Sequence, residues 1–429
     1  MTPFNRKLLY FILLYTCIEG LVVNVTFPSK IGYVFKDLLI VVSAVLLLMD
    51  NKGQPFGSLS RIQLPLMMFA FVQVAYLMMT GDMPLLAKLV GLKMRLLYIP
   101  AMLIGYRFVR SPMDVYRLVV VLAIAAIPVS IFGIYLYFAG PSALQAIGGT
   151  YSAIVYSTTG VWRVPGTFNS PGQYGLYLMF NSVIAAGLLL TPGLTARFRA
   201  ILWTSLAIMT LAVMVSGSRS PLILTVAGTG LVLLGTGRFG RVVSMGIGLY
   251  VIFAIGFATF GAGVADRVGS IASMEHIDRF NHTYFGQMFI PTLLNAPMGL
   301  GLGTATIGAR HFSEFNEIIL IESYFGVVSL ETGVLGFLTL LIALVSILTF
   351  VAKARPLMRA APAASIWFAL AAFVIIEVLI SPVSTPLDSA PGNFYFWLSL
   401  GIIAKLYDLE RWRRAAALSA AGPPEGQAA

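Results

Sequence analysis

The chain has 429 residues, of which 58% are hydrophobic and only 10% are charged, and its formal net charge is +11. Soluble domains contain roughly 45–50% apolar and about 25% charged residues, so this composition excludes a soluble globular protein and indicates an integral membrane protein. The basic residues mostly stand in short loops between apolar runs. We therefore attribute the positive charge to membrane orientation and expect no nucleic-acid partner.

Apolar runs recur along the chain, and they suit α-helices that cross about 30 Å of hydrocarbon. The predicted fold class is all-α, a polytopic membrane protein of about twelve transmembrane helices with one large outer loop between spans 9 and 10. The run at 8–27 resembles a signal peptide, but no small-residue cleavage site follows it, so we expect a retained span. The predicted spans are 8–27, 37–49, 62–79, 90–106, 116–138, 172–190, 200–216, 220–236, 242–261, 321–350, 363–380 and 393–408.

Basic residues gather in alternate loops, which the positive-inside rule assigns to the cytoplasm. This distribution predicts an even number of spans with both termini cytoplasmic. We expect one transmembrane domain over residues 1–414, with outer segments at about 140–172 and 262–320. The remaining residues, 415–429, have the small-residue and proline bias of a disordered tail.

Two arginines fall on the predicted outer side, against the orientation rule. Arg163 lies in WRVPGTFNSPGQYG before the sixth span, and Arg219 in VSGSRSPLI begins the eighth. Prolines and glycines around Arg163 predict turns, and Asn169 and Ser170 are available to cap the following helix. Arginine near a helix N-terminus offers donors that match an anion such as a lipid diphosphate. The alternative is that each arginine only extends to the lipid headgroups.

Other polar residues extend this candidate site. The fourth span, LAKLVGLKMRLLYIP, carries three cations that form a basic groove for the same headgroup or pair with Glu19 and Asp37 of neighbouring spans. We expect further contacts with the diphosphate or glycan from the serines beside Arg219 and from arginines of the long outer loop. These candidates are Lys88, Lys93, Arg95, Ser216, Ser218, Arg267, Arg279 and Arg310.

The tenth span, in IESYFGVVSLETGVLGFL, contains two glutamates. An ionisable residue in a membrane span is a functional candidate by default. Glu322 lies near the outer end of the span, where it can accept a proton from an incoming hydroxyl. Glu331 lies deeper, and we interpret it as a buried hydrogen-bond acceptor. Upstream, GLGLGTATIG lacks the lysine and the preceding strand of a phosphate-binding loop, and it predicts a turn.

Neither cysteine nor histidine indicates a metal site. Cys17 is the only cysteine, which also excludes an intrachain disulfide. The three histidines, His276, His282 and His311, lack the spacing of zinc ligands. We therefore expect no metal and no cofactor.

Three stretches in their order resemble the O-antigen ligase and Wzy-type polymerase family of bacterial envelope glycosyltransferases. They are RVPGTFNSPGQYGLYL before the sixth span, SGSRSPLILTVAGTGLVLL at the eighth, and PMGLGLGT followed by ESYFGVVSLETGVLGFL at the tenth. The resemblance covers about Arg163 to Leu340, and the span layout agrees over the whole chain.

The resemblance implies a metal-independent enzyme of the bacterial inner membrane that acts at the periplasmic or external face. It implies a donor glycan on undecaprenyl diphosphate, a sugar hydroxyl as acceptor, and a chain-length regulator and a flippase as partners. Arg219 matches the family's arginine in a Ser-x-x-Arg-like motif, which implies contact with the donor diphosphate. Arg163 or one of the loop arginines then supplies a second cation.

The chain departs from the ligase pattern at one position. Where ligases carry a histidine base this sequence has Glu322, and His311 lies eleven residues earlier. The difference favours a polymerase of O-antigen or exopolysaccharide repeat units over a ligase that transfers glycan to lipid A core or protein. A lipid-linked glycan flippase or secondary transporter is the alternative from another class, although the two halves of the chain look unlike.

Overall fold

The computed structural model consists of α-helices and connecting turns, and no β-strand forms among the residues that it describes. The all-α class predicted from composition is therefore confirmed for this part of the chain. The described residues are 2–26, 31–49, 56–78, 83–147, 162–237, 239–260, 290–306, 308–309 and 321–420.

In the first part of the chain the described helices, in chain order, are α1 (Pro3–Leu21), α2 (Ile31–Met49), α3 (Ser60–Met78), α4 (Leu85–Leu96), α5 (Pro100–Phe108), α6 (Pro112–Ala139) and α7 (Pro141–Ala146). The later helices are α8 (Pro171–Leu189), α9 (Ala196–Val215), α10 (Arg219–Thr236), α11 (Phe239–Phe260), α14 (Ile290–Asn295), α15 (Tyr324–Arg359), α16 (Ala364–Ile380) and α17 (Gly392–Ala420). A 3-10 turn, η6 (Pro386–Asp388), precedes α17.

Eight stretches of the described chain are long and apolar enough to cross a membrane, and each coincides with a predicted span. Helices α2, α8, α16 and α17 lie at the other four predicted spans. The eight stretches are Pro3–Val25, Gly57–Met78, Leu85–Phe108, Pro112–Ala139, Ala196–Val215, Arg219–Thr236, Val243–Phe260 and Tyr324–Arg359.

Local sequence signals explain several helix boundaries. The Ser170 hydroxyl accepts a hydrogen bond from the Gln173 N–H at 3.2 Å, which confirms the predicted cap of α8. Ser111 and Asp114 form a capping box at the start of α6. The predicted span at 90–106 contains a break, because helix α4 ends at Leu96 and α5 begins at Pro100, whose ring suits a first helical turn.

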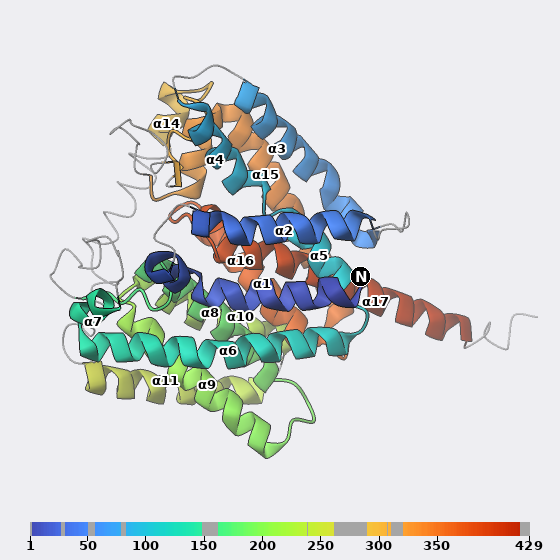
Figure 1. Ribbon diagram of the computed structural model, residues 1–429. Coiled ribbons are helices and arrows are strands. Elements are labelled where there is room, and N and C mark those ends of the chain that lie inside the picture. The colour runs from blue at the N-terminus through green and yellow to red at the C-terminus, as the bar shows by residue number, and fades with distance from the viewer. Residues whose placement is uncertain are drawn as a thin grey trace, which may run out of the picture.

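The helices pack side by side in a bundle, and the start of α1 and the end of α17 lie at the same end of it (Figure 1). We call this end the proximal end. The opposite end, where α1 ends and α8, α10 and α15 begin, is called the distal end. There the Leu21 N–H donates to the Thr167 carbonyl at 3.1 Å, which joins the end of α1 to the segment before α8.

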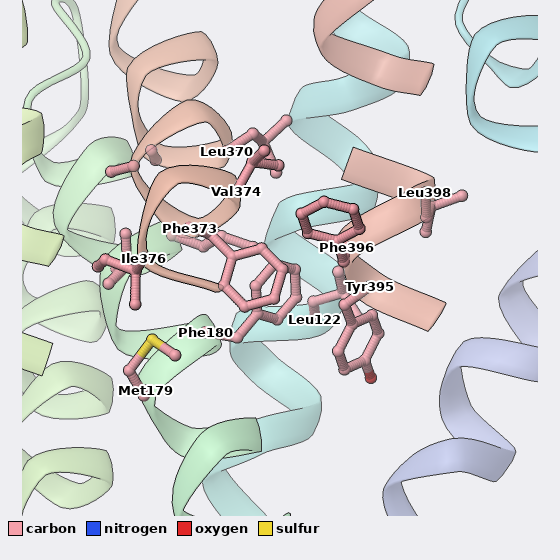
Figure 2. Packing of buried hydrophobic residues seen from close by; sticks show 14 of the residues in the cluster. Leu122, Met179, Phe180, Leu370, Phe373, Val374, Ile376, Tyr395, Phe396 and Leu398 are labelled. Carbon is pink, nitrogen blue, oxygen red and sulfur yellow. The ribbon is translucent and has the colours of Figure 1, made fainter. Parts of the chain in front are cut away.

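Helix α8 lies at the centre of the bundle, where it packs against α9, α10 and α16 and is buried almost throughout. The Phe180 ring stacks on Tyr395 of α17 with centroids 4.5 Å apart and contacts Phe373 of α16 at the same distance (Figure 2). Large apolar side chains on the periphery are exposed instead, including Phe71 and Tyr250, each 75% exposed. Such a surface suits hydrocarbon and is not expected of a soluble protein.

Helix α15 is interrupted at Gly333, whose φ of 61° and ψ of −159° are not helical. The glycine turn 297–301 occupies the interruption. The Leu300 and Gly301 N–H groups donate to the Leu330 and Glu331 carbonyls at 2.7 and 3.0 Å. In return the Val334 N–H donates to the Pro297 carbonyl at 2.9 Å. These bonds satisfy backbone groups that the interruption leaves without helical partners, as membrane depth requires. GLGLGT thus forms the predicted turn.

Candidate functional site

The segment before α8 lies against the turn that joins α9 to α10. The Val164 N–H donates to the Val215 carbonyl at 3.4 Å, and Nη2 of Arg163 donates to the Ser218 hydroxyl at 3.0 Å. These contacts bring together the two sequence motifs that carry Arg163 and Arg219. They lie at the distal end of the bundle.

The turn before α10 explains the roles of the two predicted serines. Gly217 has a φ of 60°, a conformation that glycine adopts without steric cost. The Ser216 hydroxyl is fully buried, where it donates to the Val213 carbonyl at 2.7 Å and accepts from the Ser218 N–H at 3.2 Å. Ser216 therefore stabilises the turn, whereas Ser218 holds Arg163.

Glu322 joins the two arginines at the distal end. It is an exposed residue just before Ser323, the N-cap residue of α15, whose hydroxyl accepts from the Gly326 N–H at 3.0 Å. Burial lowers the pKa of Arg163, the nearby Glu322 carboxylate opposes that shift, and the charge of Arg219 adds to it. Arg163 is thus close enough to both of the other charged groups to interact with them. We call Arg163, Arg219 and Glu322 the distal cluster.

The distal cluster has the chemistry of an anion site with an adjacent carboxylate. Two guanidinium groups of like charge destabilise each other, and a bound anion relieves that repulsion. The Nε atom of Arg163 is buried and makes no hydrogen bond with any described residue. A planar guanidinium is suited to bidentate binding of phosphate oxygens, and an exposed carboxylate is suited to accepting a proton.

Two of the three cations of α4 form ion pairs with acidic side chains of other segments. Lys93 forms an ion pair with Asp37 of α2, which is the alternative to a basic groove that the sequence analysis gave. Arg95 pairs with Asp388 and Glu331 at 2.7 and 3.0 Å, and its side chain is completely buried. A lipid headgroup has no surface of Arg95 to contact, so we assign this residue a structural role in place of substrate binding.

The remaining predicted residues are either buried or outside the part of the chain that the structure describes. Lys88 is a buried residue of α4, 9% exposed. The loop arginines and the three histidines lie outside the described residues. They are Arg267, Arg279, Arg310, His276, His282 and His311.

Sequence reasoning missed two buried acids. Asp388 lies in a proline- and serine-rich segment after α16, and its partner Arg95 is remote in the chain, so no local pattern indicates the pair. Glu377 stands in the apolar helix ASIWFALAAFVIIEVLI, and the rule that flags ionisable residues in membrane spans applies to it directly.

Among the residues that the structure describes, no group of three or more histidine, cysteine, aspartate or glutamate side chains is arranged to hold a metal ion. In the comparison with known proteins, no protein-family model and no curated protein matches this chain.

Proposed function

We propose that this protein is a membrane glycosyltransferase that polymerises polysaccharide repeat units at the outer face of the bacterial inner membrane. The donor is an oligosaccharide linked to undecaprenyl diphosphate, and the acceptor is a sugar hydroxyl of a second lipid-linked unit. The observation that carries the proposal is the distal cluster, in which Arg163 donates to Ser218 beside Arg219 and interacts with the charges of Arg219 and Glu322.

Each member of the distal cluster has a role in this reaction. Arg163 and Arg219 bind the diphosphate and stabilise the negative charge that develops on it as it leaves. Glu322 accepts the proton of the acceptor hydroxyl. The hydroxyl oxygen then bonds to the anomeric carbon while the bond from that carbon to the diphosphate oxygen breaks, and the diphosphate departs with the electron pair. A single displacement of this kind inverts the anomeric configuration.

The proposed topology has twelve spans with both termini in the cytoplasm. Its support is the common position of the start of α1 and the end of α17, together with the basic residues of that end (Figure 1). In this topology the distal cluster faces the periplasm, where lipid-linked repeat units are presented. A flippase and a chain-length regulator are the partners that such a reaction requires.

A secondary transporter is the second candidate, and the interruption of α15 at Gly333 favours it. Interrupted helices with buried charges commonly form ion sites in transporters. Here the interruption is filled by the turn 297–301, and one Glu331 oxygen already accepts four hydrogen bonds. This arrangement leaves little coordination capacity for a transported ion, so we rank the transferase first.

The test is transfer by the purified protein in lipid nanodiscs, supplied with one synthetic undecaprenyl-diphosphate oligosaccharide. We expect a ladder of longer lipid-linked chains, and Arg219→Ala and Glu322→Gln are each expected to reduce it at least about 100-fold. Arg199→Ala, which removes an exposed arginine of α9, is the matched control and is expected to retain wild-type activity.

Other outcomes separate the alternatives. Transfer of one unit to lipid A core or to protein, with no ladder, identifies a ligase. Movement of intact lipid-linked substrate across a proteoliposome membrane without any transfer identifies a flippase. Wild-type ladders from Arg219→Ala or Glu322→Gln remove that residue from the mechanism.

A further inference from the structure

A buried charge network lies directly beneath the start of α15. Nη1 of Arg95 donates to Oδ1 of Asp388 at 2.7 Å, and Nη2 donates to Oε2 of Glu331 at 3.0 Å. The guanidinium carbon lies 5.0 Å from the centroid of the Tyr324 ring. We call Arg95, Glu331, Asp388 and Tyr324 the Arg95 network. It joins α4, η6 and the first part of α15.

The second carboxylate oxygen of Glu331 binds the turn after Gly301. Oε1 accepts the backbone N–H groups of Gly303, Ala305 and Thr306 at 3.1, 3.0 and 2.8 Å, and the Thr306 hydroxyl at 2.9 Å. A carboxylate with this many donors is held in one orientation, and its charge is compensated on both oxygens. Glu331 therefore connects residues 303–306 to Arg95.

The interruption at Gly333 makes the first part of α15 depend on these contacts. An unbroken helix would align Tyr324–Thr332 with the rest of α15 through its own backbone hydrogen bonds. Non-helical angles at Gly333 remove that alignment. The direction of the nine-residue segment is then set by the turn 297–301, by Glu331 and by Tyr324.

Glu322 lies two residues before Tyr324, at the end of this segment. The Tyr324 N–H donates to the carbonyls of both Ser381 and Ser384 at 2.9 Å, so the segment also rests on the chain between α16 and η6. Arg95 holds η6, which directly follows that chain, through Asp388. The position of Glu322 thus depends on Arg95 through two routes, the Tyr324 ring and the chain that binds the Tyr324 backbone.

We propose that Arg95 and Glu331 are positioning residues that hold Glu322 at its working distance from Arg163 and Arg219. The inference rests on the proposed function, since it assigns these buried residues to the same site. They touch no substrate. A shift of about 1 Å in a reacting group lowers a rate by about 100-fold, so a network of this kind matters to turnover even where binding is unchanged.

The first experiment measures turnover, donor affinity and melting temperature of Glu331→Gln in nanodiscs. We expect turnover to fall about 100-fold while the Kd for the lipid-linked donor, which the arginines determine, stays within about threefold. Glu331→Asp is expected to restore part of the turnover. The matched control is Asp408→Asn. Asp408 lies on α17 at the proximal end, and its buried carboxylate accepts hydrogen bonds from Ser58 and Tyr106. The control is expected to leave distal turnover per folded molecule unchanged.

Two results overturn the inference. One is wild-type turnover in folded Glu331→Gln. The other is a parallel loss of turnover and donor affinity per folded molecule, which a purely structural role produces. If Glu331→Gln does not fold, Tyr324→Leu replaces it in every measurement, because that change removes the ring beside Arg95 and keeps both ion pairs.

The second experiment needs no activity, and it therefore separates failure of this inference from failure of the proposed function. Spin labels are attached at Ser220→Cys and Glu322→Cys in a Cys17→Ser background, and the distance distribution between them is measured. We expect a narrow distribution that Glu331→Gln broadens and Asp408→Asn does not. An unchanged distribution in Glu331→Gln overturns the inference, whether or not the wild-type protein transfers glycan.

Discussion

Two buried glutamates show how surroundings decide what a side chain does. Glu331 accepts hydrogen bonds on both oxygens and pairs with Arg95, whereas neither oxygen of the fully buried Glu377 has a hydrogen-bond partner among the described residues. A charged carboxylate without donors is very costly in an apolar interior, so Glu377 is accommodated as the neutral acid. The same residue type thus serves as the acceptor of a charge network in α15 and as an uncharged group in α16.

This contrast predicts different responses to one substitution. Glu331→Gln is expected to lower the free energy of unfolding by about 3 kcal/mol or more, because it breaks a buried ion pair and leaves Arg95 with one partner. Glu377→Gln is expected to change it by less than about 1 kcal/mol, because a neutral amide replaces a neutral acid. Reversible unfolding in mixed micelles measures both values, and equal losses would contradict the difference in surroundings.

At the scale of elements, the interruption of α15 depends on a glycine. A Cβ atom on Gly333 would lie 2.2 Å from the Pro297 carbonyl oxygen, and the φ of 61° disfavours any L-residue. The turn 297–301 and the interruption therefore require each other. The first part of α15 is free to take its own direction only because this position bears no side chain.

Gly333→Ala is accordingly expected to destabilise the protein by about 1–3 kcal/mol, the cost of holding alanine in a backbone region that only glycine readily adopts, before any clash is added. Gly230→Ala in α10 is the matched control. A Cβ atom there meets no atom within 4 Å, and alanine favours a helix over glycine by about 1 kcal/mol. We expect that control to be neutral or stabilising in the same unfolding assay, and a harmless Gly333→Ala would contradict the role of this position.

At the scale of the whole molecule, the bundle separates two chemically different ends. The proximal end contains both described termini and the ion pairs of Arg413 and Arg414 with Glu410, whereas the distal end contains the distal cluster. Helix α8 fills the centre between them with aromatic and aliphatic side chains (Figure 2). Any reaction at the distal cluster is therefore remote from the proximal end.

With the proposed topology, this separation predicts opposite labelling of the two ends. In a Cys17→Ser background, Ser170→Cys in intact cells freed of outer membrane is expected to react with an impermeant maleimide. Ser419→Cys near the end of α17 is expected to react only after the inner membrane is opened. Mass spectrometry of the labelled protein measures both reactions, and labelling of Ser419→Cys in intact cells would contradict cytoplasmic termini.

The all-α membrane fold follows from the amino-acid sequence alone, because spans of this length and hydropathy leave the chain no stable alternative outside a membrane. The sequence also indicated Arg163 and Arg219, which stand against the orientation rule, and Glu322, an ionisable residue at the edge of a span. The cap at Ser170 was predictable because it is a contact between residues close in the chain. Arg95, which the sequence predicts as a substrate contact, is completely buried in two ion pairs, and Lys93 pairs with Asp37, one of the two arrangements that the sequence allows.

Which of these charges meet depends on the packing of the helices and cannot be predicted from the sequence. Asp388 and Arg95 are 293 residues apart, and Glu331 and Arg95 are 236 apart, so no periodicity or spacing along the chain encodes either pair. The interruption at Gly333 depends in the same way on a turn from the preceding loop. Local propensity and hydropathy act over a few residues, whereas the partners of a buried charge are set by the packing of helices that are distant in sequence.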